Sequence, residues 1–128
     1  MTKRKMNPLS VDLANALLAR HQHICLSFTG DAEAVSEELI RKATIAYKSL
    51  LLKVGAPESL AESIGWYLEE VAQWCDARGL PPINTLAVNA SLGMPGPGYF
   101  TAPGSTANWG NDVRRCIACK SYPTKVPD

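Results

Sequence analysis

The feature of the sequence that most constrains its fold is an amphipathic pattern between Pro57 and Gly79. Apolar residues recur there at steps of three and four, the period of one helix face: Leu60, Ile64, Tyr67, Leu68, Val71, Trp74 and Cys75. Proline is favoured at the first helical position, and glycine is the usual residue just past a helix end. The pattern predicts one long amphipathic helix from Pro57 to Gly79.

Further helices are predicted on the N-terminal side of this pattern. Ser10 is a suitable cap for a helix over residues 11–21. Asp31 can cap a second helix that ends near residue 43, because its apolar positions are spaced by four. Residues 44–55 form a third, short helix or a continuation of the second, closed by a glycine.

Two short strands are also predicted. Residues 24–29 alternate apolar and polar side chains before a glycine, which is typical of a half-buried strand, although the same residues could extend the first helix. Pro81 and Pro82 prevent the long helix from continuing. The apolar run from Ile83 to Val88 then indicates a second strand.

Glycine and proline dominate the segment that follows the second strand. Residues 91–105 contain four glycines and three prolines, a composition typical of a hairpin tip or an irregular surface loop that can carry function. Asn108 or Asn111 can begin a last short helix that extends to Lys120. Residues 121–128 contain two prolines and are expected to fray.

The chain is expected to fold as one domain. It has 128 residues, of which 46% are hydrophobic and 20% charged, as in ordinary globular proteins. The predicted fold class is α+β and mainly helical: a helical N-terminal part, then a strand and a Gly/Pro-rich hairpin, an order compatible with a winged helix. We divide the chain into a basic, flexible tail (1–8), a helical part (9–79), a part with strand, hairpin loop and short helix (80–121), and a flexible tail (122–128).

The sequence favours a cytoplasmic protein. Its apolar runs are far shorter than the roughly 20 residues that span a bilayer, so no membrane segment is expected. The basic residues near the start are not followed by the apolar core of a secretion signal. Four irregularly spaced cysteines are too few for a secreted disulfide framework, which predicts reduced thiols.

Cys116 and Cys119 form a C-x-x-C motif. Such a motif can supply half of a zinc site or a redox dithiol. The other zinc ligands would have to come from His21, His23, Cys25 and Cys75, and the first three share one face only if that stretch is extended. Cysteines at apolar helix positions also pack as small hydrophobic residues, and that is the interpretation we favour. No metal ligand or cofactor is therefore assigned, and a small zinc-binding module remains an alternative.

The charges are distributed unevenly. Residues 31–79 carry nine acidic and five basic residues, a net charge of −4, whereas both ends are basic. Basic clusters attract nucleic-acid phosphates but also occur on solvated tails: Lys3, Arg4 and Lys5, then Arg114, Arg115, Lys120 and Lys125. The acidic residues of the long helix fit a solvated face: Glu58, Glu62, Glu69, Glu70 and Asp76. No nucleophile accompanies them, and the glycine-rich loop lacks the spacing and the lysine of a phosphate-binding loop. No catalytic residue is predicted, so the chain is not expected to be an enzyme.

Aromatic residues supply the candidate contact surface. Trp66 is offset from the apolar stripe of the long helix, so it can lie at the edge of that face as an interface anchor or pack at the edge of the core. The glycine-rich loop and the last helix contribute the other candidates. The predicted interaction residues are Trp66, Met94, Tyr99, Phe100, Trp109, Arg114 and Arg115.

The order of residue types between 44 and 100 is similar to that of a known family. A short helix carries Tyr47, Leu50, Leu51 and Gly55; the next carries Ala61 and Gly65-Trp66-Tyr67-Leu68; Leu86-Ala87-Val88 and Gly98-Tyr99 follow. This order resembles the winged-helix part of alkyltransferase-like proteins, which implies a winged-helix fold. The Pro-Cys-His-Arg active-site tetrapeptide of alkyltransferases is absent, so alkyl transfer is not implied. Residues 80–96 are also similar to small uncharacterised bacterial and phage proteins, and that similarity implies no activity.

These observations lead to one principal hypothesis. The long helix carries five acidic residues against Arg78, which would repel phosphates along a DNA groove. We therefore expect a non-enzymatic protein-binding or regulatory module of a bacterium or mobile genetic element, with a homodimer as one form of that association. The alternative is a winged-helix-like nucleic-acid-binding protein that uses its basic tail, the hairpin loop and Arg114-Arg115.

Overall fold

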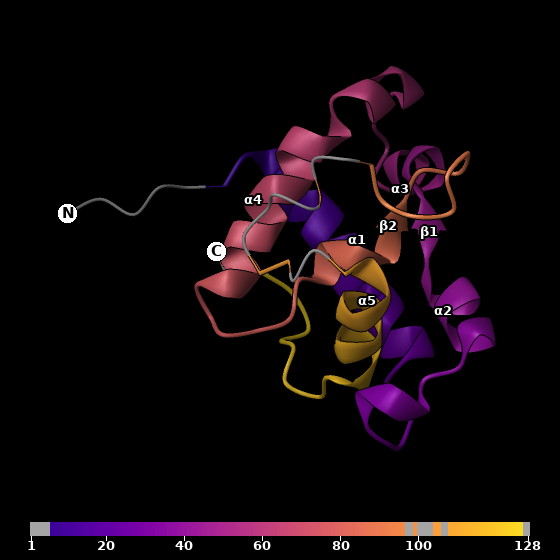
Figure 1. Cartoon of the computed structure of the whole chain (residues 1–128). Helices are drawn as coiled ribbons and strands as arrows, with labels where there is room; N and C mark the ends of the chain where they lie inside the picture. Colours follow the sequence, from indigo (N-terminus) through magenta and orange to yellow (C-terminus); the bar gives the residue numbers. More distant parts are fainter. Residues whose placement is uncertain (1–5, 97–98, 100–103, 106–107, 127–128) are drawn as a thin grey trace.

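A computed structural model describes residues 6–96, 99, 104–105 and 108–126 (Figure 1). The fold is mainly helical and α+β, as predicted, with helices surrounding a small two-stranded sheet. Among the described residues, no helix is both long and apolar enough to cross a membrane. The basic residues 3–5 and Phe100 lie outside the described residues.

The first helix, α1 (Pro8–Ile24), is longer than predicted at both ends. Asn7 rather than Ser10 caps it, because the Asn7 side-chain oxygen accepts the N–H of Leu9 at 2.9 Å. At the other end the N–H of Cys25 still bonds to the carbonyl of residue 21. Lys120 then donates to the carbonyls of Cys25, Leu26 and Phe28. The strand predicted at 24–29 is therefore wrong, because these contacts stabilise a helix end and a turn.

The second predicted helix is divided into two pieces. Asp31 caps the 3₁₀ helix η1 (Ala32–Ala34), and Ser36 caps α2 (Glu37–Ala43) by accepting the N–H of Leu39 at 3.1 Å. The chain then becomes extended and forms strand β1 (Ile45–Ala46) before α3 (Tyr47–Lys53) begins. The third helix is therefore separate from the second.

The long amphipathic pattern also forms two helices. The 3₁₀ helix η2 (Glu58–Glu62) is followed, after Ser63, by α4 (Ile64–Asp76). Gly79 has φ 67°, as expected for a glycine that follows a helix end. The apolar face of α4 is buried and packs along α1: Ile64, Leu68, Val71, Ala72, Trp74 and Cys75. The prediction of one uninterrupted helix is wrong, whereas its buried face is confirmed from Ile64 to Cys75.

The second predicted strand is present only in its last two residues. Residues 83–86 form the 3₁₀ helix η3 (Ile83–Leu86), and only β2 (Ala87–Val88) is extended. It runs parallel to β1, with Ile45 opposite Ala87 and Ala46 opposite Val88. A single antiparallel bridge between Asn89 and Met94 then closes a tight turn in which Gly93 has φ 67°. The winged-helix arrangement is not confirmed, because the sheet is parallel and this turn is closed by one bridge.

The last helix, α5 (Trp109–Ala118), begins where the sequence allowed. The Asn108 side chain accepts the N–H of Asn111 at 3.1 Å, so Asn108 is its cap. Beyond α5, the Tyr122 hydroxyl donates to the carbonyl of Pro81, and Val126 is buried. The segment expected to be a flexible tail is therefore packed against the body of the protein as far as residue 126.

Candidate functional site

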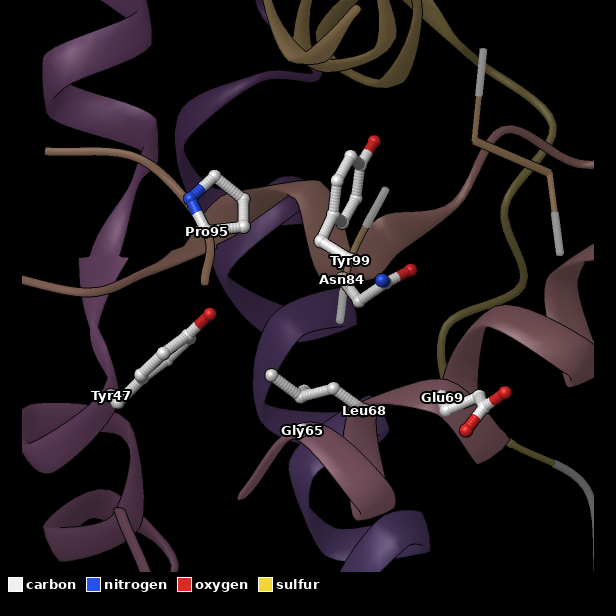
Figure 2. A pocket seen from close by; sticks show the side chains of 7 residues that line it. All are labelled: Tyr47, Gly65, Leu68, Glu69, Asn84, Pro95 and Tyr99. Atoms are coloured by element: carbon white, nitrogen blue, oxygen red, sulfur yellow. The ribbon is translucent and has the colours of Figure 1, made fainter. Parts of the chain in front are cut away.

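The candidate site is a small pocket where the N-terminal ends of α3 and α4 meet η3 and the turn after β2 (Figure 2). Its volume is about 20 Å³ for the centres of water molecules, and about 280 Å³ when its open mouth is included. It is lined by Tyr47, Gly65, Leu68, Glu69, Asn84, Pro95 and Tyr99. The inner volume suffices for one water molecule or for the end of one side chain.

Asn84 supplies an unusual polar group to this pocket. Only 3% of its surface is exposed, and among the residues that the structure describes its Oδ1 atom has no hydrogen-bond partner. The position follows from the local fold, because all of η3 is buried against α1, α4 and α5 and no side chain of η3 can turn to solvent. A buried amide oxygen without a partner has lost its hydration without compensation. Because this oxygen is closed to solvent, it represents a cost of folding rather than a group that is open to a ligand.

Tyr47 supplies the second polar group. Its hydroxyl oxygen accepts the N–H of Gly96 at 2.8 Å, which holds the turn after β2 against the start of α3. Burial raises the pKa of Tyr47, so the hydroxyl is neutral. It keeps its own hydrogen to donate, and within the described part of the chain no acceptor for that hydrogen is found.

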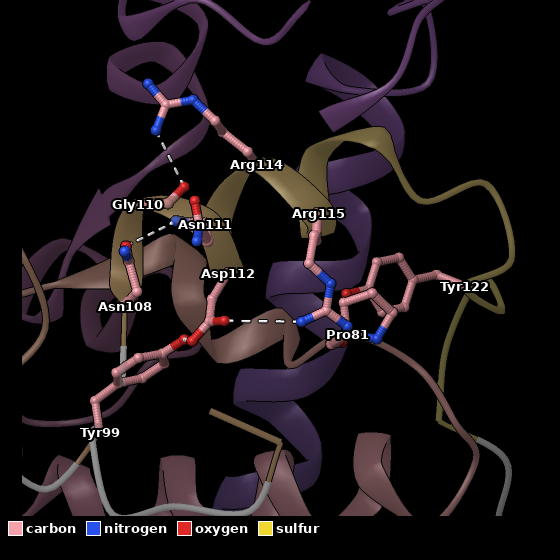
Figure 3. A network of polar contacts seen from close by, with 9 residues as sticks. All are labelled: Pro81, Tyr99, Asn108, Gly110, Asn111, Asp112, Arg114, Arg115 and Tyr122. Carbon is pink, nitrogen blue, oxygen red and sulfur yellow. Dashed lines mark hydrogen bonds and ion pairs between the residues drawn. The ribbon is translucent and has the colours of Figure 1, made fainter. Parts of the chain in front are cut away.

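The wall of the pocket is completed by Tyr99, which a buried polar contact holds in place. The Tyr99 hydroxyl donates to Oδ2 of Asp112 at 2.6 Å (Figure 3), and Asp112 is fully buried in α5. Burial, followed by the nearby carboxylate, raises the pKa of Tyr99. Arg115 lies 3.8 Å from the other oxygen of Asp112. This contact fixes the ring of Tyr99 to the last helix.

Exposed apolar side chains border the pocket. Trp66 follows the lining residue Gly65, and 52% of its surface is exposed. Met94 precedes the lining residue Pro95 and is 36% exposed, and Leu92 on the same turn is 57% exposed. We call Trp66, Leu92 and Met94 the apolar rim.

The other predicted interaction residues have partners inside the fold. Trp109 donates its indole N–H to the carbonyl of Thr85 at 2.9 Å. Arg114 donates to the carbonyls of Val35 and Gly110, and Arg115 pairs with Asp112 (Figure 3). Of these predicted residues, Tyr99 lines the pocket. Trp66 and Met94 are exposed and follow or precede lining residues in the sequence, whereas Trp109 and Arg114 contact the interior of the fold.

Three of the four cysteines are buried in the core, in agreement with their interpretation as small hydrophobic residues. Cys25, Cys75 and Cys116 are buried, and burial raises their pKa values to about 11, 11 and 12, respectively. Cys119 is half-buried. No group of three or more His, Cys, Asp or Glu side chains suited to a metal ion forms within the described ranges.

The zinc arrangement drawn from the sequence does not form. It required His21, His23 and Cys25 on one extended face, but His21 and His23 belong to α1 and Cys25 follows it as the C-cap. The ring of His21 is buried, and its Nε2 atom lies 2.8 Å from the carbonyl oxygen of Cys116. His23 is exposed at the surface. The helical backbone keeps His21 and Cys25 on one buried face but turns His23 away from both of them.

Sequence reasoning missed three buried polar residues. Glu70 was expected on a solvated face, but it is buried and accepts hydrogen bonds from Ser10 Oγ at 2.6 Å and from the N–H of Asn7 at 3.0 Å. Asp112 and Asn84 had not been considered. Glu70 follows Tyr67 by three residues and precedes Trp74 by four, so it shares their helix face, and this spacing was a usable signal. No local pattern distinguishes Asn84.

No known family model, curated protein or solved structure matches this chain significantly. The described lining residues that can donate or accept a proton are Glu69, Tyr47 and Tyr99. Apolar and aromatic side chains form the rest of the described walls, together with the amide of Asn84.

Proposed function

We propose that this protein is a non-enzymatic protein-binding module whose contact surface is the pocket together with the apolar rim. The observation that carries the proposal is the exposure of Trp66 and Met94, which are the sequence neighbours of the pocket residues Gly65 and Pro95. Large exposed aromatic and apolar side chains around a recess are typical of the central part of a protein interface.

The state of the charged residues supports a protein partner over a nucleic acid. Arg114 and Lys120 donate to backbone carbonyls, and Arg115 pairs with a buried carboxylate. Arg20 likewise donates to the carbonyls of residues 42–44. These cations would have to give up internal partners to bind phosphates, which weakens the nucleic-acid alternative.

Site-specific photo-crosslinking in cells of the source organism tests the proposal. A benzophenone amino acid is placed at Trp66 in one variant and at Met94 in another, with Leu26 as the matched control. Leu26 is 45% exposed and lies just beyond the C-terminal end of α1, away from the pocket. We expect the same protein to be crosslinked from both rim positions and not from the control.

Two outcomes would count against this assignment. Crosslinks from Leu26 to the same protein would place the contact elsewhere or make it non-specific. An absence of crosslinks from both rim positions, in cells where the chain is folded and abundant, would remove the case for a partner at this surface. Crosslinking of the chain to itself would identify the partner as a second copy.

A further inference from the structure

The surface that carries Trp66 belongs to a stretch of sequence that is almost free of positive charge. Residues 54–113 contain six acidic residues and one basic residue, Arg78, which gives a net charge of −5. Residues 1–53 and 114–128 together carry twelve basic and six acidic residues, a net charge of +6. The helices η2 and α4 and the turn after β2 therefore form the acidic part of the chain.

Arg78, the one cation of this stretch, already has partners inside the fold. It donates to the carbonyl oxygen of Trp74 at 3.3 Å, and its guanidinium lies 4.7 Å from the centre of the Trp74 ring. Within the described ranges, no ion pair involves an acidic residue of η2 or α4. The exposed carboxylates of these two helices therefore have no counter-charge within ion-pair distance there: Glu58, Glu62, Glu69 and Asp76.

One of these carboxylates lies beside the exposed tryptophan of α4. Trp66 and Glu69 are three residues apart on the helix, so they are neighbours on its surface, with Cβ atoms about 5–6 Å apart. Trp66 is 52% exposed, and its ring makes an edge-on contact with Tyr67 at 5.0 Å between ring centres. Glu69 is also exposed. An aromatic ring and a carboxylate both attract positive charge, so this pair of side chains suits a cation.

We infer that the partner protein contacts this face of α4 with a basic segment, and that an arginine or lysine of that segment lies between Trp66 and Glu69. This inference rests on the proposed protein-binding function and names the chemistry of the partner. An acidic segment would be repelled by the carboxylates of η2 and α4, and a neutral segment would leave them without a counter-charge in the interface. Arginine fits best, because its planar guanidinium stacks on an aromatic ring and its N–H groups donate to a carboxylate.

Three peptides of one design test the charge preference. They share the same leucines at the same positions, and their remaining positions are all arginine, all glutamine or all glutamate. Each is titrated into the full-length ¹⁵N-labelled protein, and the indole N–H of Trp66 and the backbone amide of Glu69 are followed by NMR. At low salt we expect saturable shifts with the arginine peptide, binding of the glutamine peptide weaker by at least about fivefold, and the weakest binding with glutamate. Added salt should reduce the advantage of arginine, because it screens exposed charges.

Single-residue variants identify the side chains responsible. Glu69→Gln should weaken binding of the arginine peptide by about fivefold, and Trp66→Ala by about tenfold. Glu37→Gln is the matched control, because it removes one exposed carboxylate from α2 and should change the affinity by less than about twofold. All three side chains are exposed, so none of these substitutions opens the core.

Several outcomes would overturn the inference. They are equal affinity for the arginine and glutamine peptides, no shift with any peptide, and an effect of Glu69→Gln no larger than that of Glu37→Gln. Shifts of the same signals with protein concentration, or on replacing the basic residues 3–5 by glutamine, would also overturn it, because a second copy or the chain itself would then cover this face. A partner crosslinked from Trp66 and Met94 despite such a result would leave the proposed function standing, so the two failures are distinguishable.

Discussion

Replacing Asn84 with leucine is expected to stabilise the protein. Asn84 is 3% exposed, and its Oδ1 atom has no hydrogen-bond partner in the described part of the chain, so its burial costs about 1–3 kcal/mol of folding free energy. Leucine has a similar size and adds buried apolar carbon worth about 1 kcal/mol. Crowding against the neighbouring core offsets about 1 kcal/mol of this gain. The net expectation is an increase of about 1–3 kcal/mol in the free energy of unfolding.

Urea unfolding followed by tryptophan fluorescence measures this change. With a slope of about 2 kcal/mol per molar urea, the midpoint should rise by about 0.5–1.5 M at unchanged slope. Asn15→Leu is the matched control, because Asn15 Oδ1 accepts the N–H of Val126 at 2.7 Å and its loss should cost about 1 kcal/mol. If Asn84→Leu destabilised the protein as much as Asn15→Leu does, Asn84 would have a native partner and the reasoning about the pocket would be refuted.

Three further predictions concern the core. Burial is the main cause that lowers the pKa of His21, so the free energy of unfolding should be highest above pH 6.5 and should decrease as the pH falls below that value. Urea unfolding at several pH values measures this dependence. His21→Phe should remove it, and the exposed-site variant His23→Gln should keep it. Tyr99→Phe removes the donor to the buried Asp112 carboxylate and should lower the free energy of unfolding by about 2–3 kcal/mol, and a loss below 0.5 kcal/mol would contradict the 2.6 Å contact. In native protein at pH 8, Ellman's reagent should modify Cys119 much faster than the other cysteines, which are buried and have raised pKa values; equal rates at all four would contradict this packing.

Local features of the sequence predicted most of the helices. The caps at Asp31 and Asn108 and the closing glycine at position 79 each act within a few residues, so they can be recognised without knowledge of the fold. The apolar period of α4 is local in the same sense. Its interruption at Ser63 was not predicted, because a 3₁₀ turn and an α-helical turn place similar side chains on the buried face.

Contacts between distant residues decided what the sequence left open. Residues 24–29 could be strand or helix, and the choice depends on Lys120, which binds Cys25 O and Leu26 O from 95 and 94 residues away. Glu70 is buried because Ser10, 60 residues earlier, donates to it. Such partners are not visible in any window of sequence.

The candidate site was predictable only in part. Trp66 was identified because it falls outside an apolar stripe, and its exposure follows from the same helical period. The pocket beside it could not be predicted, because it requires α3, α4, η3 and the turn after β2 to converge. The burial of Asn84 depends on that convergence and on the 3₁₀ conformation of residues 83–86, for which the sequence predicted a strand.

Amide hydrogen exchange of the protein alone and in complex with the crosslinked partner tests the central claim most directly. The account predicts that the partner slows exchange at residues 64–69 and 89–96, the two segments that carry the apolar rim and most of the pocket's mouth. Unchanged exchange in both segments, with protection on α5 or at the C-terminal end of α1 instead, would contradict it.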